Sequence, residues 1–174
     1  MVIFTVAAYR GDETLNFIGL GVYWVLDIVD GYLARTLDQE TQTGAQFDIL
    51  SDRLLVAFFY FNYVTFHPEV LIPVVLFLFE FMLIDHFLSN QFLLYDIKSP
   101  NYFAHIHKRI YDLNWSMAGK AINSGLVTLL LIFTKSAIIA TIAISIIIVV
   151  KLYSLALLHT FERRAVKTED EAAA

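Results

Sequence analysis

The sequence predicts an all-α integral membrane protein, a six-helix transmembrane bundle with a shortened first helix. Of its 174 residues, 58% are hydrophobic and only 17% are charged, and the mean hydropathy is +0.64. A soluble domain of this length has too little interior to bury so much apolar surface. Apolar runs of about 20 residues, the length that crosses a bilayer as a helix, recur along the chain. We therefore expect the lipid bilayer to surround most of the protein.

Five apolar stretches are long enough to span a bilayer as helices. They cover roughly residues 15–36, 45–66, 70–95, 115–134 and 137–160. A sixth stretch, residues 2–9, is only about half as long as a span. We expect it to be the end of a first helix whose beginning is missing or lost through a misplaced start. Residues 1–162 would form a single transmembrane domain, and residues 163–174 a charged tail.

Charged residues indicate an orientation and exclude some functions. The net charge of −5 argues against nucleic acid as a partner. The absence of cysteine excludes disulfides and Cys-based zinc sites. With a cytoplasmic amino terminus, most positive charges fall on the cytoplasmic side, as is usual for membrane proteins. These are Arg35, Lys98, Lys108, Arg109, Arg163, Arg164 and Lys167, whereas Arg10 and Lys135 lie on the opposite side. The tail would then be cytoplasmic.

The stretch DIVDGYLARTLDQETQTGAQFDILSD, residues 27–52, carries five aspartates between apolar segments, and four of them lie at helical spacings. Asp27 and Asp30 share one side of the first full span, and Asp48 and Asp52 share one side of the next. A short polar hairpin joins the two helices, so the four carboxylates should meet at the membrane border. Such charges repel one another and resist leaving water, and divalent cations offset both costs. Oxygen ligands of this kind favour Mg²⁺ or Mn²⁺.

Small residues and an arginine accompany these acids. Gly31, Ala34 and Gly44 remove side-chain bulk beside the carboxylates, so a ligand can approach the backbone closely. Arg35 offers a planar set of donors that suits phosphate. Together these residues suggest a metal-assisted transfer at a diphosphate, in which a carboxylate takes a proton from an attacking hydroxyl.

The spacing also resembles a known family. Asp27, Asp30-Gly31, Ala34-Arg35, Gly44, Asp48 and Asp52 are spaced as in the signature of the CDP-alcohol phosphotransferases, and the segment WSMAGKAIN is similar to a stretch of many members. The resemblance implies a six-helix enzyme, usually a homodimer, whose cytoplasm-facing site transfers a phosphoalcohol from a CDP-alcohol to an acceptor alcohol and releases CMP. Carried over, Asp27, Asp30 and Asp48 would bind two divalent ions with help from Asp52. Asp52 would be the general base. Gly31, Ala34, Arg35 and Gly44 would receive the CDP-alcohol. The donor would be CDP-diacylglycerol, a membrane lipid used in phospholipid biosynthesis.

Polar residues outside the motif supply further predictions. Lys108, Arg109 and Lys120 are candidates to hold an anionic acceptor or lipid headgroup. Glu80 and Lys151 lie deep within spans, and we expect them to form an ion pair.

Two other functions remain open. The same acids could line a cation transporter or channel if they lay along a polar path near the bilayer midplane. Alternatively, the chain could be a truncated, non-catalytic homologue that acts as a partner subunit.

Overall fold

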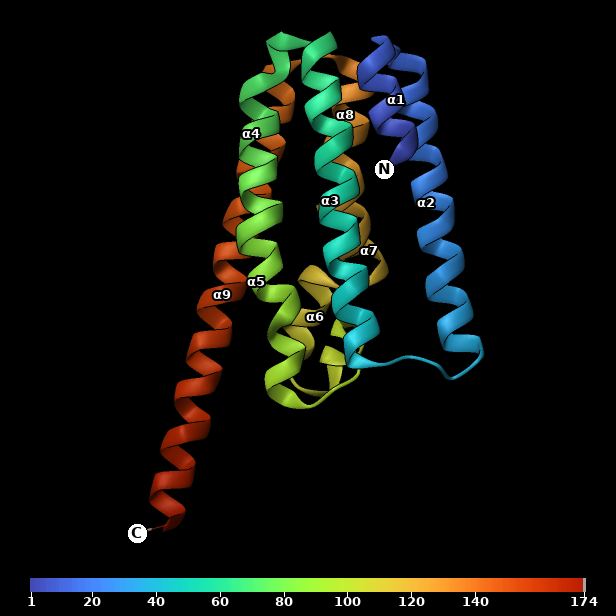
Figure 1. The fold of residues 1–174 in the computed structure, drawn as a ribbon. Helices are drawn as coiled ribbons and strands as arrows, with labels where there is room; N and C mark the ends of the chain where they lie inside the picture. Colours follow the sequence, from blue (N-terminus) through green and yellow to red (C-terminus); the bar gives the residue numbers. More distant parts are fainter. Residues whose placement is uncertain (174) are drawn as a thin grey trace.

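The computed structural model is an all-helical bundle (Figure 1). It describes the backbone of residues 1–173, and the side chains of these residues except Ser124 and 162–173. Its α-helices are α1 (Val2–Arg10), α2 (Glu13–Thr36), α3 (Gln42–Phe66), α4 (Leu71–Phe79), α5 (His86–Ser89), α6 (Lys108–Asn114), α7 (Met117–Lys120), α8 (Val127–Thr134) and α9 (Ala137–Ala173). Short 3₁₀ turns cover Pro68–Val70, Asn90–Tyr95 and Pro100–His105, and π-helical turns cover Glu80–Asp85 and Ala121–Leu126.

The predicted spans are confirmed. Five helical segments of the described chain are long and apolar enough to cross a membrane: Glu13–Thr36, Gln42–Phe66, Pro68–Tyr95, Lys108–Thr134 and Ala137–Phe161. The fourth begins earlier than predicted, because α6, which His107 caps, precedes α7. A break at Trp115 separates the two helices. The predicted tail continues the backbone of α9 to Ala173, and its side chains lie outside the described residues.

The short first helix folds back on α2. Gly11 reverses the chain with φ 62°, a left-handed conformation that favours glycine. A β-carbon added at Gly19 would lie 2.7 Å from the ring of Phe4, so this glycine lets the two helices pack closely. Asn62 of α3 donates hydrogen bonds to the Phe4 carbonyl (2.9 Å) and to Asn16 (3.0 Å). These buried bonds fix α1 against α2 and α3.

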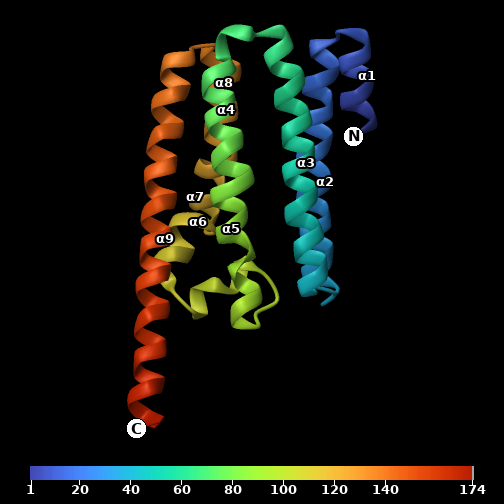
Figure 2. The same ribbon diagram turned by 60° about the vertical axis from the view of Figure 1, so that its left-hand side comes forward.

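The long helices form two layers (Figure 2). Helices α1, α2 and α3 make one layer, and α4, α8 and α9 make the other. A large apolar core, which includes Tyr60, Tyr63, Phe77 and Leu131, joins the layers. A smaller cluster of Leu88, Phe103, Ile110, Trp115 and Leu158 lies toward the end that carries the 37–41 and 96–107 connections. Residues of both clusters border the space beside the acidic motif.

Candidate functional site

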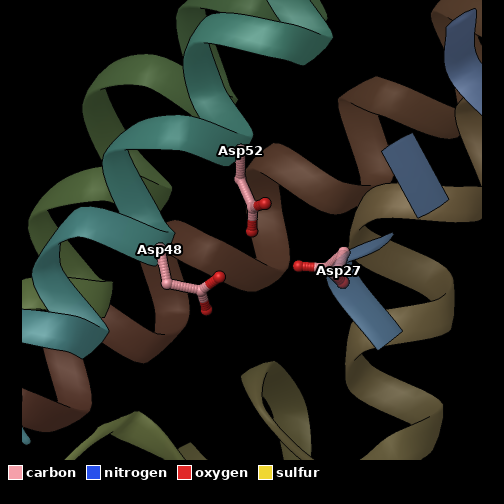
Figure 3. A group of neighbouring side chains, drawn as sticks. All are labelled: Asp27, Asp48 and Asp52. Carbon is pink, nitrogen blue, oxygen red and sulfur yellow. The ribbon is translucent and has the colours of Figure 1, made fainter. Parts of the chain in front are cut away.

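Three of the four motif aspartates converge between α2 and α3. Asp48 and Asp52 extend from successive turns of α3, and Asp27 extends toward them from α2 (Figure 3). One carboxylate oxygen from each lies within 4.8 Å of the other two. Asp27 and Asp52 are half-buried and Asp48 is exposed. Spacing by three and four residues on two neighbouring helices therefore produces a compact set of oxygen ligands.

This set fits a hard divalent cation. Carboxylate oxygens are the ligands that Mg²⁺ prefers, at about 2.1 Å, so two oxygens on one ion lie at most about 4.2 Å apart. A set that spans up to 4.8 Å is close to that limit. The three carboxylates also repel one another, which a bound cation would relieve. The acids can therefore hold a metal with small side-chain adjustments.

Two cavities meet at these acids. The inner cavity has a volume of about 280 Å³ and extends between the helix layers from Asp27 and Asp52 to Tyr60 and Phe77. The outer cavity, of about 430 Å³, opens at the end of the bundle beside the α2–α3 connection. Asp48 borders both. A molecule spanning the two cavities would pass directly over the carboxylates.

The remaining motif residues surround the outer cavity. Its lining includes Asp30, Gly31, Ala34, Arg35 and Gly44. Asp30 is therefore outside the three-carboxylate set, although it shares the outer cavity with Asp48. Its predicted role as a metal ligand stays a prediction.

Gly31 and Gly44 each have a specific structural reason to lack a side chain. A β-carbon on Gly31 would lie 3.2 Å from the Arg35 guanidinium, so the clearance expected for a ligand is occupied by the protein's own arginine. A β-carbon on Gly44 would lie 3.1 Å from Thr41 Oγ1, which accepts a hydrogen bond from the Gly44 N–H at 3.0 Å and thereby caps α3. The start of α3, with its partial positive charge, consequently borders the outer cavity beside Arg35.

Tyr23 belongs to the site although the motif does not include it. Its hydroxyl donates a hydrogen bond to Asp52 Oδ1 at 2.9 Å, and its ring borders the inner cavity. Tyr23 lies one turn before Asp27 on α2, and this i, i+4 spacing was the only signal of its position in the sequence. The bond holds one Asp52 oxygen across the helix interface.

The 96–107 connection borders the site at the end of the bundle. Ser99 and Asn101 border both cavities, and Lys120 donates to Asn101 Oδ1 at 2.6 Å. The connection is tied to the α2–α3 turn, where Tyr102 donates a hydrogen bond to Glu40 that raises the pKa of Tyr102 above its ordinary value. Sequence reasoning missed this segment, because its residues form no motif.

A buried charge network lies beside Asp52. Asp85 pairs with Arg53 (2.5 Å) and, through its other oxygen, with Lys151 (2.5 Å), joining α3, the π-helical turn and α9. The predicted Glu80–Lys151 pair is thus wrong. Glu80 is fully buried and its carboxylate has no hydrogen-bond partner among the described residues. Asp85, at the end of the π-helical turn, pairs with Lys151 instead of Glu80 and also contacts Arg53.

Of the three basic residues predicted to hold an anionic acceptor or lipid headgroup, two lie away from the acids. Lys108 pairs with Asp112 at 2.6 Å, and the Arg109 guanidinium lies 5.2 Å from the centre of the Tyr153 ring. Neither borders either cavity, whereas Lys120 borders the inner one. Gly119 lets α7 approach α6, since a β-carbon there would lie 3.0 Å from the Asn114 backbone.

Comparison with known proteins identifies one family. The model of the family described as CDP-alcohol phosphatidyltransferase matches residues 1–159, which confirms the resemblance seen in residues 27–52. No curated protein matches the chain significantly, and neither does any solved structure.

Proposed function

The chain belongs to the CDP-alcohol phosphatidyltransferase family, and from this membership we propose that it transfers a phosphoalcohol group from a CDP-alcohol to an acceptor alcohol, releasing CMP. The donor is CDP-diacylglycerol, so the group is phosphatidyl and the reaction belongs to phospholipid biosynthesis. The observation that carries the proposal is the convergence of Asp27, Asp48 and Asp52 where two cavities meet.

The outer cavity would hold the donor's nucleotide. Gly31, Ala34 and Gly44 line it without large side chains, and Arg35, which lies over Gly31, provides positive charge for phosphate together with the start of α3. Asp27, Asp48 and Asp52, with Asp30 nearby, would hold two Mg²⁺ or Mn²⁺ ions. When bound, these ions neutralise the diphosphate and stabilise the leaving phosphate.

Asp52 would act as the general base. The acceptor hydroxyl, in the inner cavity, loses its proton to Asp52 as its oxygen bonds to the phosphorus that carries the alcohol group of the donor. The bond from that phosphorus to the oxygen shared with CMP breaks, and CMP leaves with the electron pair. Tyr23 orients Asp52 through its hydrogen bond to Oδ1, leaving the other oxygen to face the acceptor.

The membrane arrangement follows from the same proposal. Residues 1–162 are the catalytic domain, the acids face the cytoplasm, and residues 163–174 form the cytoplasmic tail. The lipid donor reaches the acids from the bilayer. The protein works as a homodimer, as the family resemblance implies.

The proposal is tested by CMP release. The full chain in lipid vesicles, given CDP-diacylglycerol, Mg²⁺ or Mn²⁺ and a panel of alcohols, should release CMP only when both metal and an alcohol are present. Release that chelation does not abolish would contradict the metal role. A folded protein that binds donor but releases no CMP with any alcohol would instead support the non-catalytic homologue.

Tyr23→Phe should lower turnover by about tenfold, because Asp52 loses the hydrogen bond that orients it. The KM for the donor should stay unchanged, since Tyr23 does not border the outer cavity. Steady-state CMP release measures both parameters. Phe58→Tyr, on the same layer but outside both linings, is the control. Unchanged turnover in Tyr23→Phe would exclude the orienting role.

Gly31→Ala should raise the donor KM by about three- to tenfold and leave turnover at saturating donor nearly unchanged. The added methyl group would lie 3.2 Å from the Arg35 guanidinium and shift it by a few tenths of an ångström from its position in the outer cavity. Gly21→Ala on the same helix, where an added β-carbon has nothing within 4 Å, is the matched control. Equal donor KM values in the two variants would argue against a donor contact by Arg35.

A further inference from the structure

One wall of the inner cavity consists of polar residues that the acidic motif does not include. Ser89, Ser99, Asn114, Trp115 and Asn123 border this cavity together with Asp52. They come from α5, the 96–107 connection, the end of α6 with the break that follows it, and the π-helical turn after α7, so only the tertiary structure brings them together. The wall offers hydroxyl, amide and indole groups beside the proposed base.

Three of these residues keep a polar atom without a protein partner. Ser99 Oγ, Asn114 Oδ1 and Trp115 Nε1 are buried and have no hydrogen-bond partner among the described residues. The residues themselves are 6%, 2% and 6% exposed, respectively. Buried polar groups are nearly always satisfied, and an unsatisfied one is costly. A ligand that supplies both donors and acceptors at this wall would remove that cost.

The two cations that border the inner cavity, Arg53 and Lys120, each donate to a protein group. Arg53 pairs with Asp85 at 2.5 Å, and Lys120 donates to Asn101 at 2.6 Å. Asp85 in turn is shared between Arg53 and Lys151. A phosphate monoester would therefore have to compete with Asp85 for Arg53 or with Asn101 for Lys120. An ammonium group would compete with Arg53 and Lys151 for the carboxylate.

We infer that this wall is the acceptor subsite and that the acceptor is a small, uncharged alcohol with several hydroxyl groups. The inference rests on the proposed function and specifies its acceptor. Hydroxyl groups both donate and accept, so they match the mixed set of Ser99, Asn114 and Trp115. The volume of about 280 Å³ lies just below the usual range for ligand pockets, about 300–1,000 Å³, and so suits a small headgroup.

The class of acceptor is tested by comparing CMP release with alcohols of different charge, each supplied separately. The full chain in vesicles with CDP-diacylglycerol and Mg²⁺ or Mn²⁺ is given glycerol or inositol, glycerol 3-phosphate, or choline, and CMP release is measured. Donor binding is measured separately, by metal-dependent protection of the protein against thermal unfolding. We expect donor binding, and CMP release with an uncharged polyol only.

Each other outcome has a distinct meaning. Donor binding with release on glycerol 3-phosphate or choline but not on the polyols overturns the acceptor class and keeps the transferase. Donor binding without release on any of them overturns the acceptor class and supports the non-catalytic homologue. No donor binding and no release overturns the proposed function, and the acceptor subsite with it.

Two variants test the wall itself. Ser99→Ala and Trp115→Phe each remove a polar atom that has no partner among the described residues. Trp115→Phe also replaces a buried ring of the smaller apolar cluster with another aromatic ring, so we expect both variants to fold. Each should raise the acceptor KM by about three- to tenfold and leave donor binding unchanged. Ser145→Ala, on the exposed face of α9 and outside both cavities, is the control. Unchanged acceptor KM in both wall variants, or an equal rise in donor KM, overturns the subsite.

Discussion

Asp52→Asn should reduce CMP release by about 10²- to 10⁴-fold, the usual contribution of a general base. The amide keeps the size of the side chain but cannot accept the proton of the acceptor hydroxyl. Asp52 also belongs to the three-carboxylate set, so weaker metal binding could reduce the rate as well. Turnover should therefore be measured across a series of Mg²⁺ concentrations. A loss that persists at saturating metal identifies the base.

The control for Asp52→Asn is Asp38→Asn. Asp38 lies in the α2–α3 turn with φ 51°, a conformation that asparagine also tolerates. It pairs with Lys98 at the surface and borders neither cavity. Its substitution should leave CMP release near the wild-type rate. Activity of Asp52→Asn within a few-fold of this control, at saturating metal, would contradict the assigned base.

Asp85→Asn should lower the free energy of unfolding by about 3–5 kcal/mol, the usual cost of breaking a buried ion pair. The change leaves Arg53 and Lys151, 5% and 0% exposed, without their shared counter-ion. The network joins α3 to α9 across the two layers, so its loss should also loosen the turn that carries Asp52. Unfolding in mixed micelles of increasing denaturing detergent measures the effect.

Two further variants distinguish this network from its alternatives. Asp112→Asn removes an exposed ion pair with Lys108 and should change stability little. Glu80→Gln should cost much less than Asp85→Asn, because Glu80 forms no ion pair in the described structure. Equal losses in Glu80→Gln and Asp85→Asn would mean that Lys151 depends on Glu80 after all.

Local sequence features were sufficient to predict the helices and the core of the motif. Apolar runs as long as a bilayer is thick predicted all five spans found in the described chain, because length and hydropathy determine whether a helix can cross. The spacing of the four motif aspartates predicted that all of them meet, and the structure brings Asp27, Asp48 and Asp52 together. Asp30 instead borders the outer cavity. It follows Asp27 by three residues, and on a helix this spacing makes the two side chains point about 60° apart.

The sequence by itself therefore determined the class of protein, its spans and the acids that two adjacent helices share. Only the tertiary structure decided the partner of Lys151, the contact of Tyr23 with Asp52 and the polar wall formed by Ser99, Asn114 and Trp115. The physical reason is the distance along the chain between the residues that make contact. Helical periodicity relates residues within a few turns, whereas these contacts join segments far apart in the chain, and packing between the layers and local turns such as Glu80–Asp85 set which side chains meet.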